Sequence, residues 1–315
     1  MRTDAKPDFP TTIDNTMRSS FVACPQKYFR TYFQHWKPCQ ESVDLVAGKA
    51  YAAGIETARR EFFEKKNPSI DDCITAGVQA LVHEYGDFEP PPGHVKTLDR
   101  MIGALDEYFR NYGFATDHIQ PYFNDGKPAI EFSFALPIPG TSHPTTGEPL
   151  LYTGRFDMLG VYNGSIFVVD EKTTKQLGQS WVKSWTMASQ FTGYCWAAEQ
   201  FGYPVAGAII RGISILKTKY GHAESIQYRP QWFIDRWLVQ LRKDTERMIQ
   251  AWEKDDWEYD FNTSCNSYGG CSLMDVCNSQ NPERVLEQNF VKRVWDPLAR
   301  EEKVLEKEQG NEGSL

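Results

Sequence analysis

The feature that most restricts the fold is a turn signal near the middle of the chain, where Asn163 and Gly164 separate two runs of β-branched and aromatic residues. An Asn-Gly pair favours a two-residue type I′ turn, because both residues tolerate a positive φ. Counting outward from this turn along both strands places Asp157 directly opposite Asp170. Opposed side chains share one face of the sheet with Cβ atoms about 5 Å apart, where like charges destabilise the pairing. The sequence therefore predicts a β-hairpin that carries two carboxylates at repelling distance.

The residues after Asp170 add a cation to the same face. Because side chains alternate along a strand, Asp170 and Lys172 point to one face and Glu171 points to the other. The same pairing places Arg155 opposite Lys172. Two such carboxylates suit a hard divalent cation, Mg²⁺ or Mn²⁺, and a nearby ammonium can orient the metal-bound water or offset charge on a phosphate. The alternative is a solvated strand face, against which the apolar run before Asp170 and the repulsion with Asp157 both argue.

Composition limits the class of protein. The chain has 315 residues, of which 41% are hydrophobic and 14% aromatic, enough for a packed core. The net charge of −8 and the pI near 5.4 argue against a protein that coats nucleic acid by bulk charge, but they leave room for a local basic cleft. No apolar run approaches the roughly 20 residues of a membrane span, and the first residues are polar. We therefore expect a soluble cytoplasmic protein without membrane association.

Periodicity and breaking residues divide the chain into a helical first part and a mixed second part. In the first part, helices are expected over residues 15–35, 43–65, 70–85 and 95–112. In the second part, strands are expected over 129–137, on both sides of the Asn-Gly turn and over 205–216, with helices over 184–201 and 231–252. This order predicts an α/β fold in which helices cover the sheet.

Three short motifs follow one another in the second part: Gly154-Arg-Phe-Asp157, Val169-Asp170-Glu-Lys172-Thr173 and Gln190-Phe-Thr-Gly-Tyr194. This series resembles the core motifs of the PD-(D/E)XK nuclease superfamily, and it is most similar to the RecB-like branch. That branch includes the CRISPR-associated RecB-like exonucleases, the AddB nuclease domain and many phage-encoded members. The resemblance extends from about Ser20 to Cys277.

The resemblance implies a restriction-endonuclease-like core and a metal-dependent DNA exonuclease. The enzyme would act on DNA ends, single-stranded or frayed, in phage or bacterial recombination, repair or DNA processing. The resemblance also implies that Asp157, Asp170 and the backbone carbonyl of Glu171 bind Mg²⁺ or Mn²⁺, and that Lys172 completes the catalytic motif. The location would be the host cytoplasm if the gene belongs to a phage, and no protein partner is indicated.

Gln190 and Tyr194 match the QxxxY element, which in that branch helps to position the lysine and the DNA strand. Residues four apart also share a helix face, so a buried hydrogen-bonded pair is the structural alternative. Two rival functions stay open for the whole chain. One is a structure-specific or CRISPR-adaptation end-trimming endonuclease, and the other is a non-catalytic DNA-binding relative of the same fold.

The resemblance further implies one nuclease domain over residues 1–285. Its expected parts are a helical region, a nuclease core and a cluster-binding segment joined with Cys24, over residues 15–112, 128–252 and 260–280. Residues 286–315 are highly charged, and we expect a partly disordered tail there.

Upstream, the stretch from Gly48 to Glu56 resembles the helical GxxxHxxxE element of the branch, with one departure. Ala52 stands where the histidine usually stands, so one expected metal ligand is missing. Glu56, one helical turn later, is the obvious substitute, and a carboxylate there favours Mg²⁺ or Mn²⁺. Glu131 is a second candidate for this role, and a merely solvated Glu56 is the alternative.

The chain has seven cysteines, and because this number is odd, disulfide bonds within the chain cannot pair all of them. Cys24 lies in a Cys-Pro-x-x-Tyr context, and three more cysteines follow the expected core: Cys265, Cys271 and Cys277. This arrangement resembles the four-cysteine [4Fe–4S] set of the same branch, in which four thiolates hold the cluster. Structural zinc and free thiols stay open, and Cys39 could replace Cys265.

A basic and aromatic segment follows the motif strand. Lys175 and Lys183 can neutralise phosphates and Trp181 can stack on unpaired bases, so we expect these residues and Arg155 to contact DNA. The alternative for Trp181 is a helix start that packs on the sheet.

Overall fold

The computed structural model describes residues 6–267, 270–299 and 301–304. The chain divides into two compact units, each assembled from separate segments. The first unit comprises residues 1–40, 135–154 and 238–315, and the second unit comprises residues 41–134 and 155–237. One nuclease domain over 1–285 stays a prediction.

The hairpin around Asn163 and Gly164 forms as the sequence predicts. It joins β7 (Leu151–Tyr162) to β8 (Ser165–Thr174), and the turn residues have φ values of +47° and +77°, as a type I′ turn requires. The antiparallel ladder runs from Tyr162↔Ser165 to Met158↔Val169, which is the predicted register. The next positions outward are therefore Asp157 and Asp170.

The main sheet extends from this hairpin in both directions. β9 (Val205–Ile215) runs parallel to β8, and β10 (Tyr220–Tyr228) runs antiparallel to β9, while β3 (Gln120–Pro121) and β6 (Ile130–Pro137) pair with β7. The run from Phe167 to Asp170 is buried, as expected for a strand with neighbours on both sides. The predicted mixed α/β fold is confirmed: the sheet is mixed and helices flank it.

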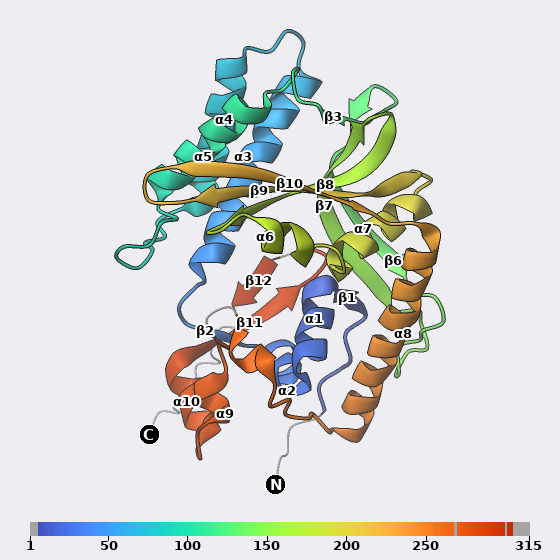
Figure 1. The fold of residues 1–315 in the computed structure, drawn as a ribbon. Coiled ribbons are helices and arrows are strands. Elements are labelled where there is room, and N and C mark those ends of the chain that lie inside the picture. Colours follow the sequence, from blue (N-terminus) through green and yellow to red (C-terminus); the bar gives the residue numbers. More distant parts are fainter. Residues whose placement is uncertain (1–5, 268–269, 300, 305–315) are drawn as a thin grey trace, which may run out of the picture. The chain divides into compact units, whose positions relative to one another are not determined.

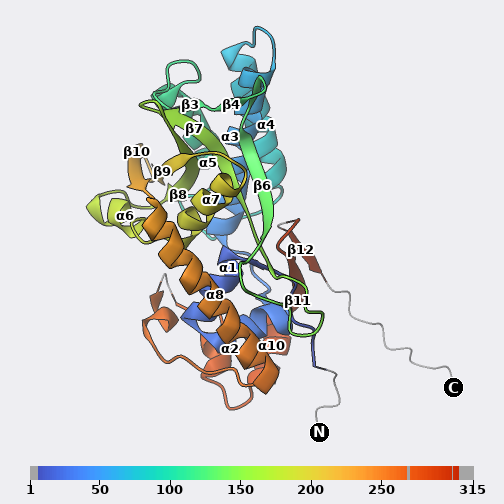
Figure 2. The same cartoon turned by 90° about the vertical axis from the view of Figure 1, so that its right-hand side faces the viewer.

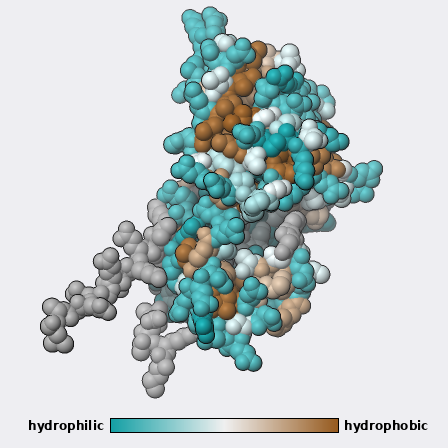
Figure 3. Space-filling view, turned by 90° about the vertical axis from the view of Figure 1, so that its left-hand side faces the viewer, coloured by the Kyte–Doolittle hydropathy of each residue, from teal (hydrophilic) through white to brown (hydrophobic). Residues whose placement is uncertain are grey.

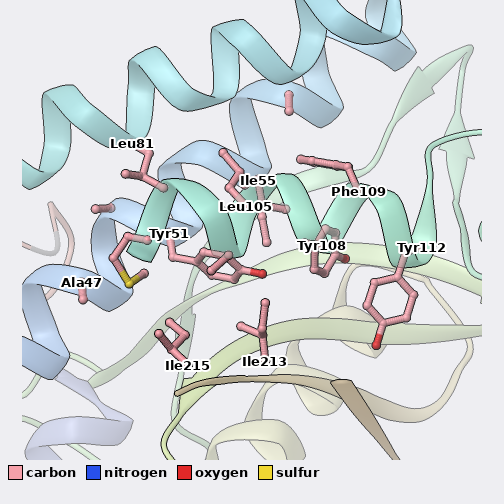
Figure 4. Packing of buried hydrophobic residues seen from close by; sticks show 14 of the residues in the cluster. Ala47, Tyr51, Ile55, Leu81, Leu105, Tyr108, Phe109, Tyr112, Ile213 and Ile215 are labelled. Carbon is pink, nitrogen blue, oxygen red and sulfur yellow. The ribbon is translucent and has the colours of Figure 1, made fainter. Parts of the chain in front are cut away.

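Three long helices of the second unit cover one face of this sheet (Figure 1): α3 (Val43–Glu64), α4 (Ile70–Tyr85) and α5 (Leu98–Tyr112). Their apolar sides enclose a core with β9, in which Tyr51, Leu81 and Leu105 meet Ile213 and Ile215 (Figure 4). α4 begins after the capping hydroxyl of Ser69, which accepts a hydrogen bond from Asp72 N–H.

The opposite face carries α6 (Gln179–Ser184) and α7 (Ser189–Gln200), and α7 contacts β8 and β9 (Figure 2). The single helix predicted over residues 184–201 is therefore wrong in its start, because a non-helical stretch separates α6 from α7. β10 was not predicted either, since its outward and inward residues are both largely polar. A small ribbon of β4 (Phe123–Asn124) and β5 (Lys127–Pro128) completes the second unit.

The first unit begins with β1 (Thr12–Asp14), which runs parallel to residues 151–153 at the start of β7. The Asp14 carboxylate then caps α1 (Asn15–Ala23) by accepting from Met17 N–H at 2.7 Å. The further helical elements are α2 (Pro25–Tyr28), a π-helical turn (Phe29–Phe33), α8 (Gln231–Lys254, of which 238–254 belong here), a 3₁₀ turn (Thr263–Cys265), α9 (Met274–Cys277) and α10 (Pro282–Asn289).

A second sheet forms where the sequence predicts a charged tail. β11 (Phe290–Asp296) pairs with β2 (Trp36–Pro38) on one side and with β12 (Glu301–Val304) on the other. Residues 290–296 and 301–304 are thus ordered strands, whereas the end of the predicted tail, 305–315, lies outside the described residues. Within the described ranges, no helix is both long and apolar enough to cross a bilayer.

Candidate active site

The two aspartates of the hairpin lie where its ladder ends. Asp157 Oδ2 accepts a hydrogen bond from Glu171 N–H at 3.0 Å, which takes the place of a further rung between the strands. Asp170 is only 3% exposed, and Lys172 Nζ lies 2.5 Å from Asp170 Oδ1. The hairpin therefore brings two carboxylates and one ammonium into one site, which belongs wholly to the second unit.

The surroundings of these groups shift their proton affinities. Burial, and then the negative charges of Asp170 and Glu171, raise the pKa of Asp157 well above its usual range. Burial opposes the charged form of Lys172, but the carboxylates of Asp170 and Asp157 outweigh it and raise the pKa of Lys172. Without a cation, the site thus retains a proton on Lys172 and favours one on Asp157.

Glu171 belongs to a buried network on the other face of β8. Its side chain is 3% exposed and forms an ion pair with Arg59 of α3, and Tyr108 Oη of α5 donates to Glu171 Oε1 at 3.0 Å. Burial raises the pKa of Glu171, but Arg59 outweighs it and the pKa is lowered, so the carboxylate stays charged. The network fixes the residue whose N–H orients Asp157.

Arg211 of β9 continues this network. Its Nη1 and Nη2 donate to the two carboxylate oxygens of Asp117 at 2.6 Å each, and its Nε donates to Glu224 Oε1 at 2.9 Å. Nη1 also donates to Tyr108 Oη at 3.1 Å, which connects the two buried arginines. A buried guanidinium is tolerated when its donors are satisfied in this way.

Sequence reasoning missed both arginines. For Arg59 a signal existed: it follows Tyr51 and Ile55 at intervals of four on an apolar helix face, where a lone cation needs a buried partner. Arg211 lies in a strand predicted as buried, where a lone cation likewise needs a buried partner.

α7 lies beside Lys172. Gln190 Nε2 donates to Tyr194 Oη at 2.8 Å, and Tyr194 also raises the pKa of Lys172, although burial is the largest influence on that group. Lys172 Nζ lies 5.7 Å from the ring centroid of Phe191. The QxxxY pair therefore shares a helix face next to the lysine, and its role in positioning DNA stays a prediction.

Glu56 and Glu131, the two candidates for a third metal ligand, lie against each other. Burial raises the pKa of Glu131 first, and the Glu56 carboxylate raises it further through a side-chain hydrogen bond. Arg60 Nε lies 2.7 Å from Glu56 Oε1, and Arg155 Nη1 lies 2.5 Å from Glu131 Oε1. Glu131 has a φ of +56°, a strained value for a residue other than glycine.

The residues predicted to contact DNA occupy different settings. Arg155 is paired with Glu131, and Lys175 and Lys183 are exposed. Trp181 of α6 packs over Gly212, where an added Cβ would lie 2.5 Å from the indole. The ring centroids of Trp181 and Trp185 are 5.6 Å apart. Packing on the sheet thus occupies part of the Trp181 ring, and base stacking by Trp181 stays a prediction.

The four cysteines of the predicted cluster all belong to the first unit. All seven cysteines of the chain are free thiols. Burial raises the pKa of Cys277, and the neighbouring thiols of Cys271, Cys24 and Cys265 raise it further, so the four groups interact. Ser264 Oγ donates to Ala23 O at 3.0 Å and so joins the segments that carry Cys24 and Cys265.

Among the described residues, no three or more His, Cys, Asp or Glu side chains are placed to hold a metal ion together. The hairpin offers two carboxylates, Asp157 and Asp170, and the four thiols do not converge on one point. Of the remaining cysteines, Cys73 and Cys195 are buried and Cys39 is exposed.

A buried aspartate, a half-buried aspartate and a lysine on the hairpin of a mixed sheet, flanked by helices, define a nuclease core. The chain belongs to the PD-(D/E)XK nuclease superfamily, whose family model matches residues 17–278. Membership implies a nuclease with DNA as its substrate, and nucleases of this superfamily generally use Mg²⁺ or Mn²⁺.

Two solved structures are similar to this chain. A "putative exonuclease" from Eubacterium rectale is 12% identical, with 81% of this chain and 86% of that chain covered and a TM-score of 0.46. The protein SSO0001 is 11% identical, with 72% and 84% covered and a TM-score of 0.29. No curated protein matches the sequence.

Proposed function

We propose that the protein is a metal-dependent DNA exonuclease of the RecB-like branch, which hydrolyses phosphodiester bonds from DNA ends. The observation that carries this proposal is the hairpin site, in which half-buried Asp157 and buried Asp170 lie together and Lys172 Nζ lies 2.5 Å from Asp170 Oδ1. The resemblance of the motif series to RecB-like exonucleases supports action from ends, in phage or bacterial recombination, repair or processing.

The donor set fits Mg²⁺ or Mn²⁺. Asp157 and Asp170 supply two neighbouring carboxylates whose charge Lys172 alone does not balance, as the raised pKa of Asp157 indicates. Mg²⁺ is typically bound by one or two carboxylates, with waters and substrate phosphates as its other ligands. The backbone carbonyl of Glu171 and the side chain of Glu56 are proposed as further ligands. When bound, the ion would polarise the phosphate and lower the pKa of a bound water.

The chain's own residues have separable tasks. The Glu171 N–H orients Asp157 through its hydrogen bond to Oδ2, and Arg59 holds Glu171 in place. Lys172 keeps its proton at Nζ, where the ammonium can offset charge that develops on a phosphate. Phe191 and Tyr194 of α7 cover Lys172 on one side and limit the access of water.

Cleavage of end-labelled DNA tests the proposal. Wild-type protein titrated with Mn²⁺ should shorten single-stranded or frayed DNA from an end, and Asp170→Asn should lose activity by at least about 10³-fold because a ligand worth several kcal/mol is removed. Asp256→Asn, an exposed aspartate outside the site, is the matched control and should cut normally. A chain that cuts no DNA, or an Asp170→Asn variant that cuts like wild type, would contradict the catalytic proposal.

The lengths of the products separate this function from its rival. An exonuclease releases short products from one labelled end from the earliest time. A structure-specific or end-trimming endonuclease instead yields internal fragments or stops after a fixed length.

We also propose that Cys24, Cys265, Cys271 and Cys277 hold a [4Fe–4S] cluster in the first unit. The influence of the other three thiols on the pKa of Cys277, after that of burial, supports this set, although the thiols do not converge. Anaerobically purified protein should then be brown and contain about four iron atoms per chain. Cys265→Ser should lose the iron and exposed Cys39→Ser should retain it, whereas one zinc per chain would overturn the proposal.

A further inference from the structure

A groove of about 300 Å³ opens in the second unit at the edge where β8 and β9 end. His94, Lys175 and Lys217 line it together with the apolar side chains of Val95, Ile215 and Leu216. We propose that this groove binds a phosphate of the DNA strand that enters the active site. The proposal rests on the proposed nuclease function and adds a binding site on the other face of the same sheet edge.

The position of the groove connects it to the catalytic lysine. Ligands of open α/β sheets bind beyond the carboxyl ends of parallel strands, and β8 and β9 are parallel here. Lys175 follows Lys172 by three residues, about 10 Å along an extended chain. The α4–α5 connection and the β9–β10 turn lie at the left of Figure 1. Figure 3 shows the molecule from that side, where the surface is mostly hydrophilic and carries separate hydrophobic areas.

A rigid turn presents His94 to the groove. His94 N–H donates to Pro91 O at 3.0 Å, and between them lie Pro92 and Gly93, which has a φ of +81°. Proline at the second position and a positive φ at the third define a type II turn. This turn fixes the backbone of His94 before any ligand arrives.

A second contact fixes which ring nitrogen of His94 can donate. His94 Nδ1 accepts a hydrogen bond from Lys96 N–H at 3.1 Å, so a neutral ring carries its proton on Nε2. Burial, and then Lys175, lower the pKa of His94, which keeps the ring neutral. Nε2–H is therefore a donor for a phosphate oxygen.

The cations of the groove outnumber the acid beside them, Asp44. Against the effect of burial, Lys96 and then Lys175 lower the pKa of Asp44. Lys96 is buried, and its Nζ forms an ion pair with Asp44 Oδ1 at 2.7 Å and donates a hydrogen bond to Thr173 Oγ1 at 2.9 Å. Lys175 and Lys217 are exposed, and neither forms an ion pair with any residue that the structure describes. In a chain of net charge −8, two such lysines make a local positive site that attracts a phosphate.

The apolar wall suits the rest of a nucleotide. Ile215 is fully buried, and Val95 and Leu216 are half-buried at the groove. A sugar or the face of a base can cover Val95 and Leu216 while the phosphate contacts the lysines and His94. A nucleotide unit of DNA matches this division better than a free inorganic anion does.

The test measures binding of fluorescent single-stranded DNA, with and without a terminal phosphate, with divalent ions chelated and at several salt concentrations. Lys175→Ala/Lys217→Ala should weaken binding and reduce the slope of log K against log salt by about 0.7, the value for the loss of one phosphate contact on single-stranded DNA. His94→Ala should weaken binding and leave the slope unchanged, because a neutral donor is lost.

Lys219→Ala is the matched control, since it removes a lysine from the same β9–β10 turn but outside the groove. It should bind like wild type. If the double variant loses the same affinity for both DNAs, the groove binds an internal phosphate. If it loses more affinity for the phosphorylated DNA, the groove binds the terminal phosphate. The proposal is overturned if the double variant keeps the wild-type slope, or if Lys219→Ala loses as much affinity for DNA as the double variant does.

Failure of the groove and failure of the proposed function look different. If wild-type protein cuts DNA with Mn²⁺ while the double variant keeps the wild-type slope, the groove proposal fails and the nuclease proposal stands. If wild-type protein does not cut DNA at all, the proposed function fails, and the groove proposal that rests on it falls as well.

Discussion

At the residue scale, the active site holds charges in places where they destabilise the fold. Asp170 is buried, Asp157 is half-buried and close enough to repel it, and Lys172 balances only part of their charge. The PD-(D/E)XK site thus gives up stability in order to keep an anionic site ready for a cation. This cost leads to a prediction about the metal-free protein.

Asp157→Asn should stabilise the metal-free protein at neutral pH by at least about 1 kcal/mol, the equivalent of one unit of pKa. The variant removes a carboxylate whose pKa is raised by partial burial and by the charges of Asp170 and Glu171. Urea unfolding in EDTA measures the difference. Mn²⁺ should then raise the melting temperature of wild type but not that of the variant.

The pH dependence of this effect has a definite sign. Between the unfolded pKa of about 3.9 and the raised folded pKa of Asp157, the folded state binds more protons than the unfolded state. The free energy of unfolding of wild type therefore falls as the pH rises through this window. The advantage of Asp157→Asn should grow over the same range and vanish below about pH 3.9; a constant difference would contradict the assignment.

Arg59→Met should destabilise the protein by about 3–5 kcal/mol, because it leaves the buried Glu171 carboxylate without its cation. Adding Glu171→Gln should recover part of the loss. Arg60→Met is the control on the same helix: its side chain is 37% exposed, pairs with glutamates of the same helix and donates to Ile130 O, so the cost should be smaller, about 1–2 kcal/mol. Chemical denaturation of the four proteins gives the comparison, and equal costs for both arginines would refute it.

At the scale of elements, turn residues and apolar periodicity predicted a helix or strand correctly where its tertiary surroundings agreed with these local patterns. The Asn163-Gly164 turn fixed the register of the hairpin, and α4 begins and ends at Ile70 and Tyr85 as expected. β10 escaped prediction because it pairs on one side only, with β9, and its side chains are largely half-buried. A half-buried strand of mixed polarity has no period that distinguishes it from a loop.

Close packing of α3 against α4 depends on glycine. A Cβ added at Gly77 would lie 2.6 Å from Gly54 O, so the two helices approach at a point where no side chain fits. Gly77→Ala should therefore destabilise the protein by about 1–3 kcal/mol through overpacking. Gly48→Ala, on the open side of α3, should instead stabilise it by about 0.5–1 kcal/mol, since nothing lies within 4 Å. Melting temperatures of both variants check the opposite signs.

At the scale of the whole molecule, each compact unit gathers distant segments of the chain. In the first unit, β11 pairs with β2, and Trp295 Nε1 donates to Asp14 Oδ2 at 2.8 Å, although 281 residues separate them. The end of the chain therefore supports the residue that caps α1. No local pattern in either segment indicates this partnership.

A chain that ends at Asn289 should lose protection from hydrogen exchange in β2 and in the first turn of α1, because β11 and the Trp295 hydrogen bond are removed. A chain that ends at Val304 keeps both strands and is the matched control. Exchange measured by mass spectrometry compares the two chains. Unchanged protection in the shorter chain would show that β11 does not stabilise these segments.

The sequence by itself determined the hairpin, its register, the alternation that sends Asp170 and Lys172 to one face, and the long helices. These features depend on turn geometry and on periods of 2 and 3.6 residues, which act over a few neighbouring positions. Only the tertiary structure decided that Arg59 and Arg211 form a buried network behind Glu171, that Glu56 lies against Glu131, and that the predicted tail supplies strands. These features depend on pairings between residues far apart in the sequence, whose energy appears only when the chain has closed around them.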